Sequence, residues 1–222
     1  MGKTVELAAA DGHKFAVYRA DPSGKPRGAI VVVQEIFGVN GHMRRVTDGF
    51  AASGYLAISP ALFDRTKRGV DLGYDPAAIA AGRDLRGAVG DDGPLADIQA
   101  TIDLAAGAGK VAVVGYCWGG ALAYLAATRL TGLACAVGYY GGGIAAAANE
   151  KTRVPVMLHF GDSDQSIPMS DVDKVRAAHP EITTYVYKAG HGFNCDERGS
   201  YDAASAKIAL DRTLAFLKEH IG

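Results

Sequence analysis

The sequence has no surplus of either charge, few cysteines and no long hydrophobic run. It carries 23 Lys and Arg against 24 Asp and Glu, a net charge of -1, which argues against a dedicated nucleic-acid binder. No apolar run approaches the roughly 20 residues of a membrane-spanning helix, and residues 1–4 do not begin a secretory signal. Cys117, Cys135 and Cys195 are too few for a disulfide framework. We expect a cytoplasmic protein with neither a membrane nor a nucleic-acid partner.

What the chain does have is a set of apolar, β-branched segments that alternate with helical patterns. With 222 residues, 49% of them hydrophobic, we expect one domain over residues 1–222. Unbroken apolar runs are typical of strands that are covered on both faces, as in a parallel sheet. The expected strands span residues 28–35, 55–60, 110–116, 134–140, 154–161 and 183–188. Residues 4–7 and 14–18 flank an Asp-Gly turn and predict an antiparallel hairpin at the sheet edge.

Helices are expected over residues 41–53, 94–106, 118–129 and 201–220, where apolar side chains recur with helical spacing. Residues 64–92 contain six glycines or prolines, and we interpret them as a cap or a mobile loop. The alternation predicts a doubly wound, mostly parallel α/β sheet. Ligands of such sheets bind beyond the carboxyl ends of the strands.

Residues 115–120 (Gly-Tyr-Cys-Trp-Gly-Gly) lie between an expected strand and an expected helix. Their spacing is that of a nucleophile elbow with cysteine in the place of serine. The tight turn needs small residues beside the nucleophile, and the helix N-terminus favours a thiolate on Cys117. The amide of Trp118 would then face the oxyanion of a reacting carbonyl. We therefore predict Cys117 as a nucleophile.

A nucleophilic thiol needs a base, and His191 is the best placed of the six histidines. It lies between two glycines directly after a strand, at the same sheet edge as Cys117. A carboxylate must orient the imidazole, and Asp162 and Asp164 both follow the strand that ends at residue 161. We favour Asp164, with Asp162 as the alternative. The chain order Cys117, Asp164, His191 is that of the α/β-hydrolases.

The loop after the strand at residues 28–35 should supply the second oxyanion donor. The amide of Ile36 has the right place in the chain. Glu35 stands out, because a carboxylate at the end of a buried strand is costly unless it is paired or protonated.

Four motifs together resemble the dienelactone hydrolase family over nearly the whole chain. They are residues 34–40 (Gln-Glu-Ile-Phe-Gly-Val-Asn), 115–120, 137–141 (Val-Gly-Tyr-Tyr-Gly) and 189–193 (Ala-Gly-His-Gly-Phe). The resemblance implies an α/β-hydrolase fold and a triad of Cys117, Asp164 and His191. It further implies that Glu35 contacts the resting thiol, and that the amides of Ile36 and Trp118 form the oxyanion hole.

The expected activity is hydrolysis of small lactones or activated esters through a thioester on Cys117. Relatives that open dienelactone bind the substrate carboxylate with arginines, one of them shortly after the catalytic histidine. Here Cys195 stands four residues after His191, and Arg198 follows three positions later; Arg83 and Arg86 are candidates for the second arginine. Cys195 is either an inert loop thiol or a resolving partner for Cys117.

No cofactor or metal is expected, because no group of ligand residues has metal-binding spacing in the sequence. The alternative to an enzyme is a thiol redox switch, or a binding protein that keeps the hydrolase scaffold. The natural substrate and the oligomeric state are not encoded in any motif.

Overall fold

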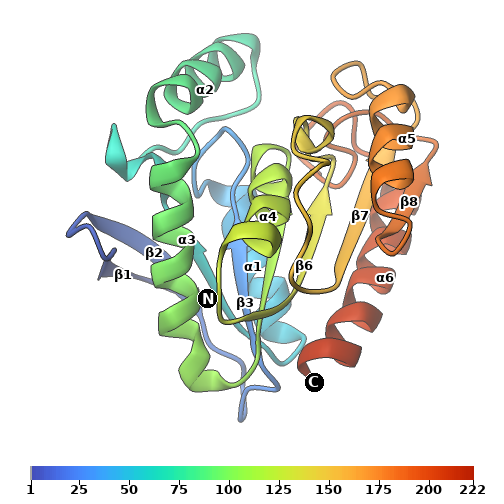
Figure 1. Cartoon of the computed structure of the whole chain (residues 1–222). Coiled ribbons are helices and arrows are strands. Elements are labelled where there is room, and N and C mark those ends of the chain that lie inside the picture. Colours follow the sequence, from blue (N-terminus) through green and yellow to red (C-terminus); the bar gives the residue numbers. More distant parts are fainter. Residues whose placement is uncertain (1) are drawn as a thin grey trace.

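The computed structural model describes residues 2–222 and contains one eight-stranded sheet between two layers of helices (Figure 1). The strand order is β1-β2-β4-β3-β5-β6-β7-β8, and the pairs from β4 to β8 are all parallel. β1 pairs antiparallel with β2, and β2 with β4, so the expected edge hairpin is confirmed. The strands are β1 (Lys3–Ala8), β2 (Lys14–Ala20), β3 (Ala29–Val33), β4 (Leu56–Pro60), β5 (Val111–Tyr116), β6 (Leu133–Tyr139), β7 (Val156–Gly161) and β8 (Thr183–Tyr187).

Helices cover both faces of the sheet. α3 and α4 pack on one face, while α1 and α6 lie on the other (Figure 1). The helices are α1 (Gly41–Ala52), α2 (Pro76–Val89), α3 (Asp92–Ala105), α4 (Trp118–Arg129), α5 (Met169–Ala178) and α6 (Ala203–Ile221). Short 3₁₀ helices are η1 (Leu62–Arg65), η2 (Ala106–Ala108) and η3 (Ile144–Ala146). The doubly wound α/β architecture expected from the sequence is therefore confirmed.

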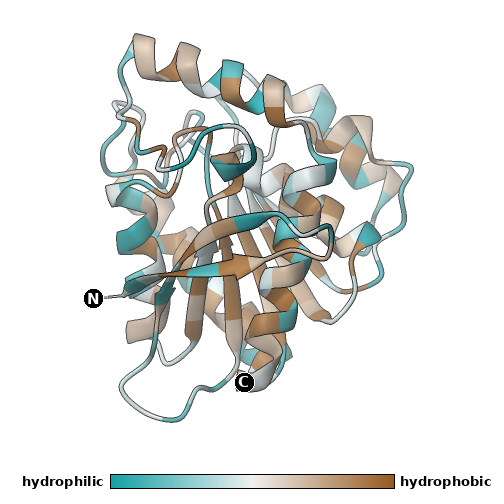
Figure 2. Ribbon diagram, turned by 90° about the vertical axis from the view of Figure 1, so that its left-hand side faces the viewer, coloured by the Kyte–Doolittle hydropathy of each residue, from teal (hydrophilic) through white to brown (hydrophobic). Residues whose placement is uncertain are grey.

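The central strands are buried along their full length, as their apolar runs predict. Every residue of β3, β4, β5 and β7 is buried, and these strands carry mostly hydrophobic residues (Figure 2). Burial on both faces requires this composition, because a polar side chain there would lose its hydration without compensation. No helix within residues 2–222 is both long and apolar enough to span a bilayer.

Of the two alternatives for residues 64–92, a cap or a mobile loop, the loop is wrong because the segment contains α2. Asp75 caps this helix by accepting a hydrogen bond from the amide of Ala78, and Pro76 occupies its first turn. The helix was missed because Gly82 and Gly87 weaken its helical propensity. α2 lies above α3, at the end of the sheet to which the arrowheads of β6 and β7 point (Figure 1). The helix α5 was also not expected from the sequence.

Candidate active site

The turn that carries Cys117 depends on glycine on either side. β5 ends at Tyr116 and α4 begins at Trp118, so Cys117 is the N-cap residue and has a φ of 54°. Such a backbone conformation costs a non-glycine residue about 1–3 kcal/mol and persists only where its surroundings enforce it. A Cβ at Gly115 would collide with the backbone of Gly119, so only glycine permits this approach of strand and helix. The turn directs Cys117 away from the packed core, and its side chain is partly exposed.

His191 connects Cys117 to Asp164. Its Nε2 lies 3.1 Å from Cys117 Sγ, and its Nδ1 lies 2.7 Å from Asp164 Oδ2. The other carboxylate oxygen of Asp164 accepts hydrogen bonds from the amides of Ser166 (2.7 Å) and Ile167 (3.2 Å). These amides hold the carboxylate rigidly, so the orientation of the imidazole is fixed by backbone groups.

Asp162, the alternative orienting residue, is exposed, and its carboxylate accepts a hydrogen bond from Ser163 Oγ instead. The structure thus brings Asp164, and not Asp162, to the histidine.

The electrostatic surroundings favour the protonated form of His191. Burial alone would lower the pKa of the imidazole, but the hydrogen bonds with Asp164 and Cys117 outweigh it and raise the pKa to about 10. The protonated imidazole lies 3.1 Å from Cys117 Sγ.

The two residues predicted to supply oxyanion donors, Ile36 and Trp118, have backbone N–H groups without an acceptor in the described residues. Ile36 and Trp118 line the same cavity as Cys117. Buried amides are rarely left without an acceptor, so an acceptor supplied by a bound molecule is expected here.

Glu35 is fully buried, but it is not bonded to the thiol. Its Oε1 lies 3.2 Å from Arg198 Nη1, and its Oε2 accepts a hydrogen bond from the Tyr74 hydroxyl at 3.2 Å. The ion pair compensates the burial of the carboxylate, while Cys117 is bonded to His191. The contact between Glu35 and the thiol that the family resemblance implies is absent from this arrangement, and a catalytic role for Glu35 stays a prediction.

All three candidate arginines line one cavity with Cys117 and His191. The cavity has a volume of about 400 Å³. Arg83 and Arg86 reach it from the exposed side of α2, and Arg198 reaches it from the loop after His191. Although Cys195 replaces the arginine expected four residues after His191, Arg198 brings a guanidinium to the cavity.

Cys195 itself is fully buried and makes no disulfide. Burial and the nearby charge of Glu35 raise the pKa of the Cys195 thiol to about 11, so it is protonated and a weak nucleophile at neutral pH. These features favour the interpretation of Cys195 as an inert thiol over that of a resolving partner.

One residue that packs on the histidine was missed. Tyr140 has a φ of 37°, and its ring lies edge-on to that of His191 at 5.2 Å. Its hydroxyl is buried without a hydrogen-bond partner in the described residues. The residue lies in the motif 137–141, but that motif carries no pattern that indicates the strained backbone of Tyr140.

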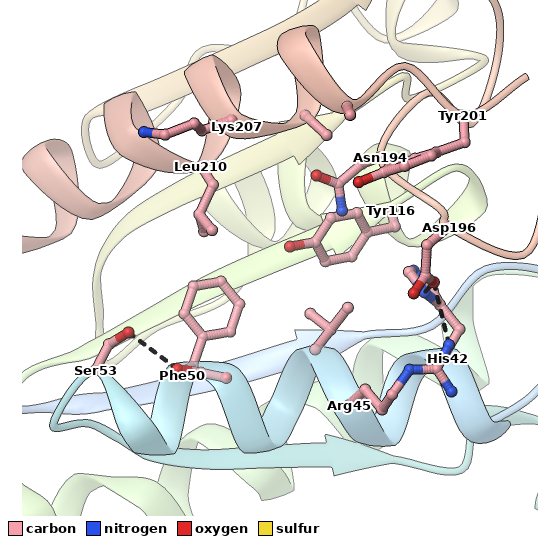
Figure 3. Close-up of a pocket in the computed structure, with 14 residues that line it drawn as sticks. His42, Arg45, Phe50, Ser53, Tyr116, Asn194, Asp196, Tyr201, Lys207 and Leu210 are labelled. Carbon is pink, nitrogen blue, oxygen red and sulfur yellow. Dashed lines mark hydrogen bonds and ion pairs between the residues drawn. The ribbon is translucent and has the colours of Figure 1, made fainter.

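Two further features lie on the α1/α6 side of the sheet. A second cavity of about 490 Å³ lies between these helices, with Phe50 and Leu210 on opposite walls (Figure 3). Beside it, possible metal ligands of Glu35, His42 and Cys195 all lie within 4.8 Å of one another. The sequence predicted no metal cluster, because these three residues are far apart in the chain.

A mostly parallel sheet with an antiparallel edge, a tight strand–turn–helix connection at Cys117 after β5 and a histidine loop after β8 are the features of an α/β-hydrolase fold. Residues 15–221 match the dienelactone hydrolase family. The chain belongs to this family, and thereby to the hydrolases.

Similar proteins agree with this assignment. The carboxymethylenebutenolidase of Pseudomonas putida is 33% identical, over 96% of this chain and 94% of that protein. A Synechocystis sp. protein provisionally named as a carboxymethylenebutenolidase is 36% identical, over 90% of this chain and 89% of that protein. The crystal structure of a protein from Klebsiella pneumoniae subsp. pneumoniae, provisionally named as a dienelactone hydrolase, superimposes with a TM-score of 0.87 at 30% identity. That superposition covers 99% of this chain and 100% of the other.

Proposed function

We propose that this protein hydrolyses small lactones or activated esters through a thioester formed on Cys117. The observation that carries the proposal is the 3.1 Å contact between Cys117 Sγ and His191 Nε2 at the N-terminus of α4. The name of the Pseudomonas putida relative, a carboxymethylenebutenolidase, supports a lactone substrate. A thiolate beside an imidazolium, with amides that lack acceptors next to it, is suited to acyl transfer.

In the proposed reaction, the Cys117 thiolate attacks the carbonyl carbon of the substrate. The amides of Ile36 and Trp118 hold the resulting oxyanion. The carbon–oxygen bond of the ester then breaks, and the alkoxide or enolate leaving group takes the proton of His191. His191, now neutral, accepts a proton from water, and the hydroxide attacks the thioester carbonyl. The carbon–sulfur bond then breaks, which releases the carboxylic acid and returns the Cys117 thiolate beside protonated His191. Asp164 keeps the imidazole in the tautomer that both steps need.

Leaving groups of low basicity suit this site best. From the tetrahedral intermediate a thiolate is expelled more readily than an ordinary alkoxide, so an unactivated alkyl ester would return to substrate. An enolate or phenolate is far less basic than an alkoxide, so it competes with the thiolate as a leaving group. This argument favours enol lactones and aryl esters.

The cavity also favours a substrate that carries a carboxylate. Glu35 neutralises Arg198, while Arg83 and Arg86 on α2 add positive charge to the wall. Clefts with an excess of one charge attract ligands of the opposite charge. A small anionic lactone is therefore the substrate class that we propose.

Acylation with an activated aryl ester tests this function directly. We expect a burst of one equivalent of phenol per chain and an acyl group on Cys117, located by mass spectrometry of the digested protein. His191→Ala should slow release of the acyl group by at least about 100-fold. Cys135→Ser, a change of a buried cysteine in β6, is the matched control and should keep the burst. A burst that survives in Cys117→Ala would overturn the proposal.

A further inference from the structure

Glu35, His42 and Cys195 bring three different ligand types together in the protein interior. Glu35 follows β3, His42 lies in the first turn of α1, and Cys195 lies in the loop that also carries Arg198. All three side chains are buried, and their potential ligand atoms lie within 4.8 Å of one another.

The imidazole of His42 has one nitrogen available for a ligand. Its Nδ1 lies 2.9 Å from Asp196 Oδ1; because a carboxylate only accepts, Nδ1 carries the proton. Nε2 then has a free lone pair, and it is buried without a hydrogen-bond partner in residues 2–222. The side chain is 4% exposed, so no bulk water reaches most of it. An imidazole held by a carboxylate on one nitrogen, with the other nitrogen free, is the arrangement of metal-binding histidines.

The combination of donors selects the ion. Calcium and magnesium prefer oxygen ligands, whereas a thiolate and an imidazole with one carboxylate suit zinc. Zinc bonds of about 2.0–2.3 Å place ligand atoms within roughly 4 Å of one another, so the three side chains need to close by about 1 Å. A water molecule would complete the tetrahedron.

The charges around the cluster balance when zinc is bound. Arg198 offsets the single charge of Glu35, whose Oε2 accepts a hydrogen bond from the Tyr74 hydroxyl. Arg45 offsets one of the two charges of Asp196 and Glu197. On binding, Cys195 releases its proton to solvent, and its thiolate together with the remaining carboxylate charge offsets the two charges of the metal.

The cavity between α1 and α6 adjoins the cluster at His42. His42 and Asp196 lie together at one end of this 490 Å³ cavity, joined by their hydrogen bond (Figure 3). Arg45 lies beside His42 on α1, and Asn194 lies across the cavity near Tyr201.

We propose that Glu35, His42 and Cys195 form a zinc site separate from the Cys117–His191 pair. The bound ion would join β3, α1 and the loop that carries Arg198. Cys117 and His191 take no part in it, although Glu35 also pairs with Arg198, which lines the cavity of the proposed hydrolase site.

Cobalt serves as the spectroscopic probe, because a thiolate bound to Co²⁺ gives a charge-transfer band in the near ultraviolet. Titration of the metal-stripped full chain with Co²⁺ should give this band with one equivalent, and Zn²⁺ should displace it. Cys195→Ser should abolish the band, whereas Cys117→Ser and Cys135→Ser should keep it. No band, or a band lost in Cys117→Ser and kept in Cys195→Ser, would overturn the proposal; the latter would place the metal in the hydrolase site.

Thermal unfolding provides a second measurement that does not depend on sulfur. With Zn²⁺ at 100 times its Kd, the Tm of the wild-type chain should rise by about 5–10 °C. His42→Gln, which removes one ligand nitrogen, should weaken Zn²⁺ binding by at least tenfold and remove most of this rise. His179→Gln is the matched control, since both nitrogens of that buried histidine already have partners. An equal rise in wild type and His42→Gln would contradict the assignment.

Discussion

The guanidinium of Arg198 lies 3.2 Å from the buried carboxylate of Glu35, across 163 residues of sequence. Arg198 of this ion pair lines the cavity that contains Cys117. It also explains how a carboxylate at the end of a buried strand is tolerated.

Breaking that pair should destabilise the protein. Arg198→Met leaves the Glu35 charge buried without a partner, and we expect the free energy of unfolding to fall by about 3–5 kcal/mol. Adding Glu35→Gln to this variant removes the uncompensated charge and should restore a large part of the loss. Urea denaturation of the single and double variants measures both effects. Losses that simply add in the double variant would show that the two side chains do not interact.

The two aspartates after β7 should differ sharply in their effect on turnover. Asp164→Asn removes the acceptor that fixes the His191 tautomer, and we expect kcat for an activated ester to fall by about 100- to 10,000-fold. Asp162→Asn is the control two residues away, with an exposed side chain, and should stay within about twofold of the wild type. Steady-state kinetics at neutral pH compares the two. Similar losses in both variants would count against Asp164 as the orienting residue.

Stability should depend on pH through His191. Its pKa is about 10 in the folded protein against an ordinary value of 6.5, so folding favours its protonated form. Its contribution to stability is complete below about pH 6.5 and is lost as the pH rises through about 10. The free energy of unfolding should therefore fall over this range more steeply in wild type than in His191→Gln. Urea denaturation at several pH values gives the comparison, and parallel profiles would refute the raised pKa.

The elbow should not tolerate a methyl group at Gly115. Gly115→Ala places a Cβ against the backbone of Gly119, and we expect a loss of at least about 3 kcal/mol in unfolding free energy, or failure to fold. Gly87→Ala is the matched control in α2, where a Cβ meets no atom within 4 Å. That change should leave stability equal or raise it by up to about 1 kcal/mol. Equal stability of the two variants would mean that strand and helix do not approach as closely as described.

The arginines of α2 should determine the preference for anionic substrates. Arg83→Met combined with Arg86→Met should lower kcat/KM for a lactone bearing a carboxylate by about tenfold or more. The value for a neutral aryl ester should change less than about twofold. Because both side chains are exposed, added salt should reduce the anionic preference of the wild type. A loss of similar size for both substrates would assign these arginines a structural role.

Most of the fold could be read from local patterns. The apolar runs gave β3, β5 and β7 to within two residues at either end, because a strand buried on both faces tolerates few polar residues. The sequence did not predict α2, because its amphipathic pattern is weak and two glycines interrupt it, although Asp75-Pro76 marks its beginning. A helix that covers a site packs little apolar surface against the core, so its sequence shows little apolar periodicity.

By itself, the sequence determined the order of strands and helices, the strained turn at Cys117 and the placement of His191 and Asp164 after successive strands. Each of these depends on residues that are neighbours in the chain. Only the tertiary structure decided that Asp164 and not Asp162 meets the imidazole, that Arg198 pairs with Glu35, and that His42 and Cys195 lie beside that carboxylate. Those contacts arise from packing between distant segments, where side-chain direction and distance, and not local spacing, determine which groups meet.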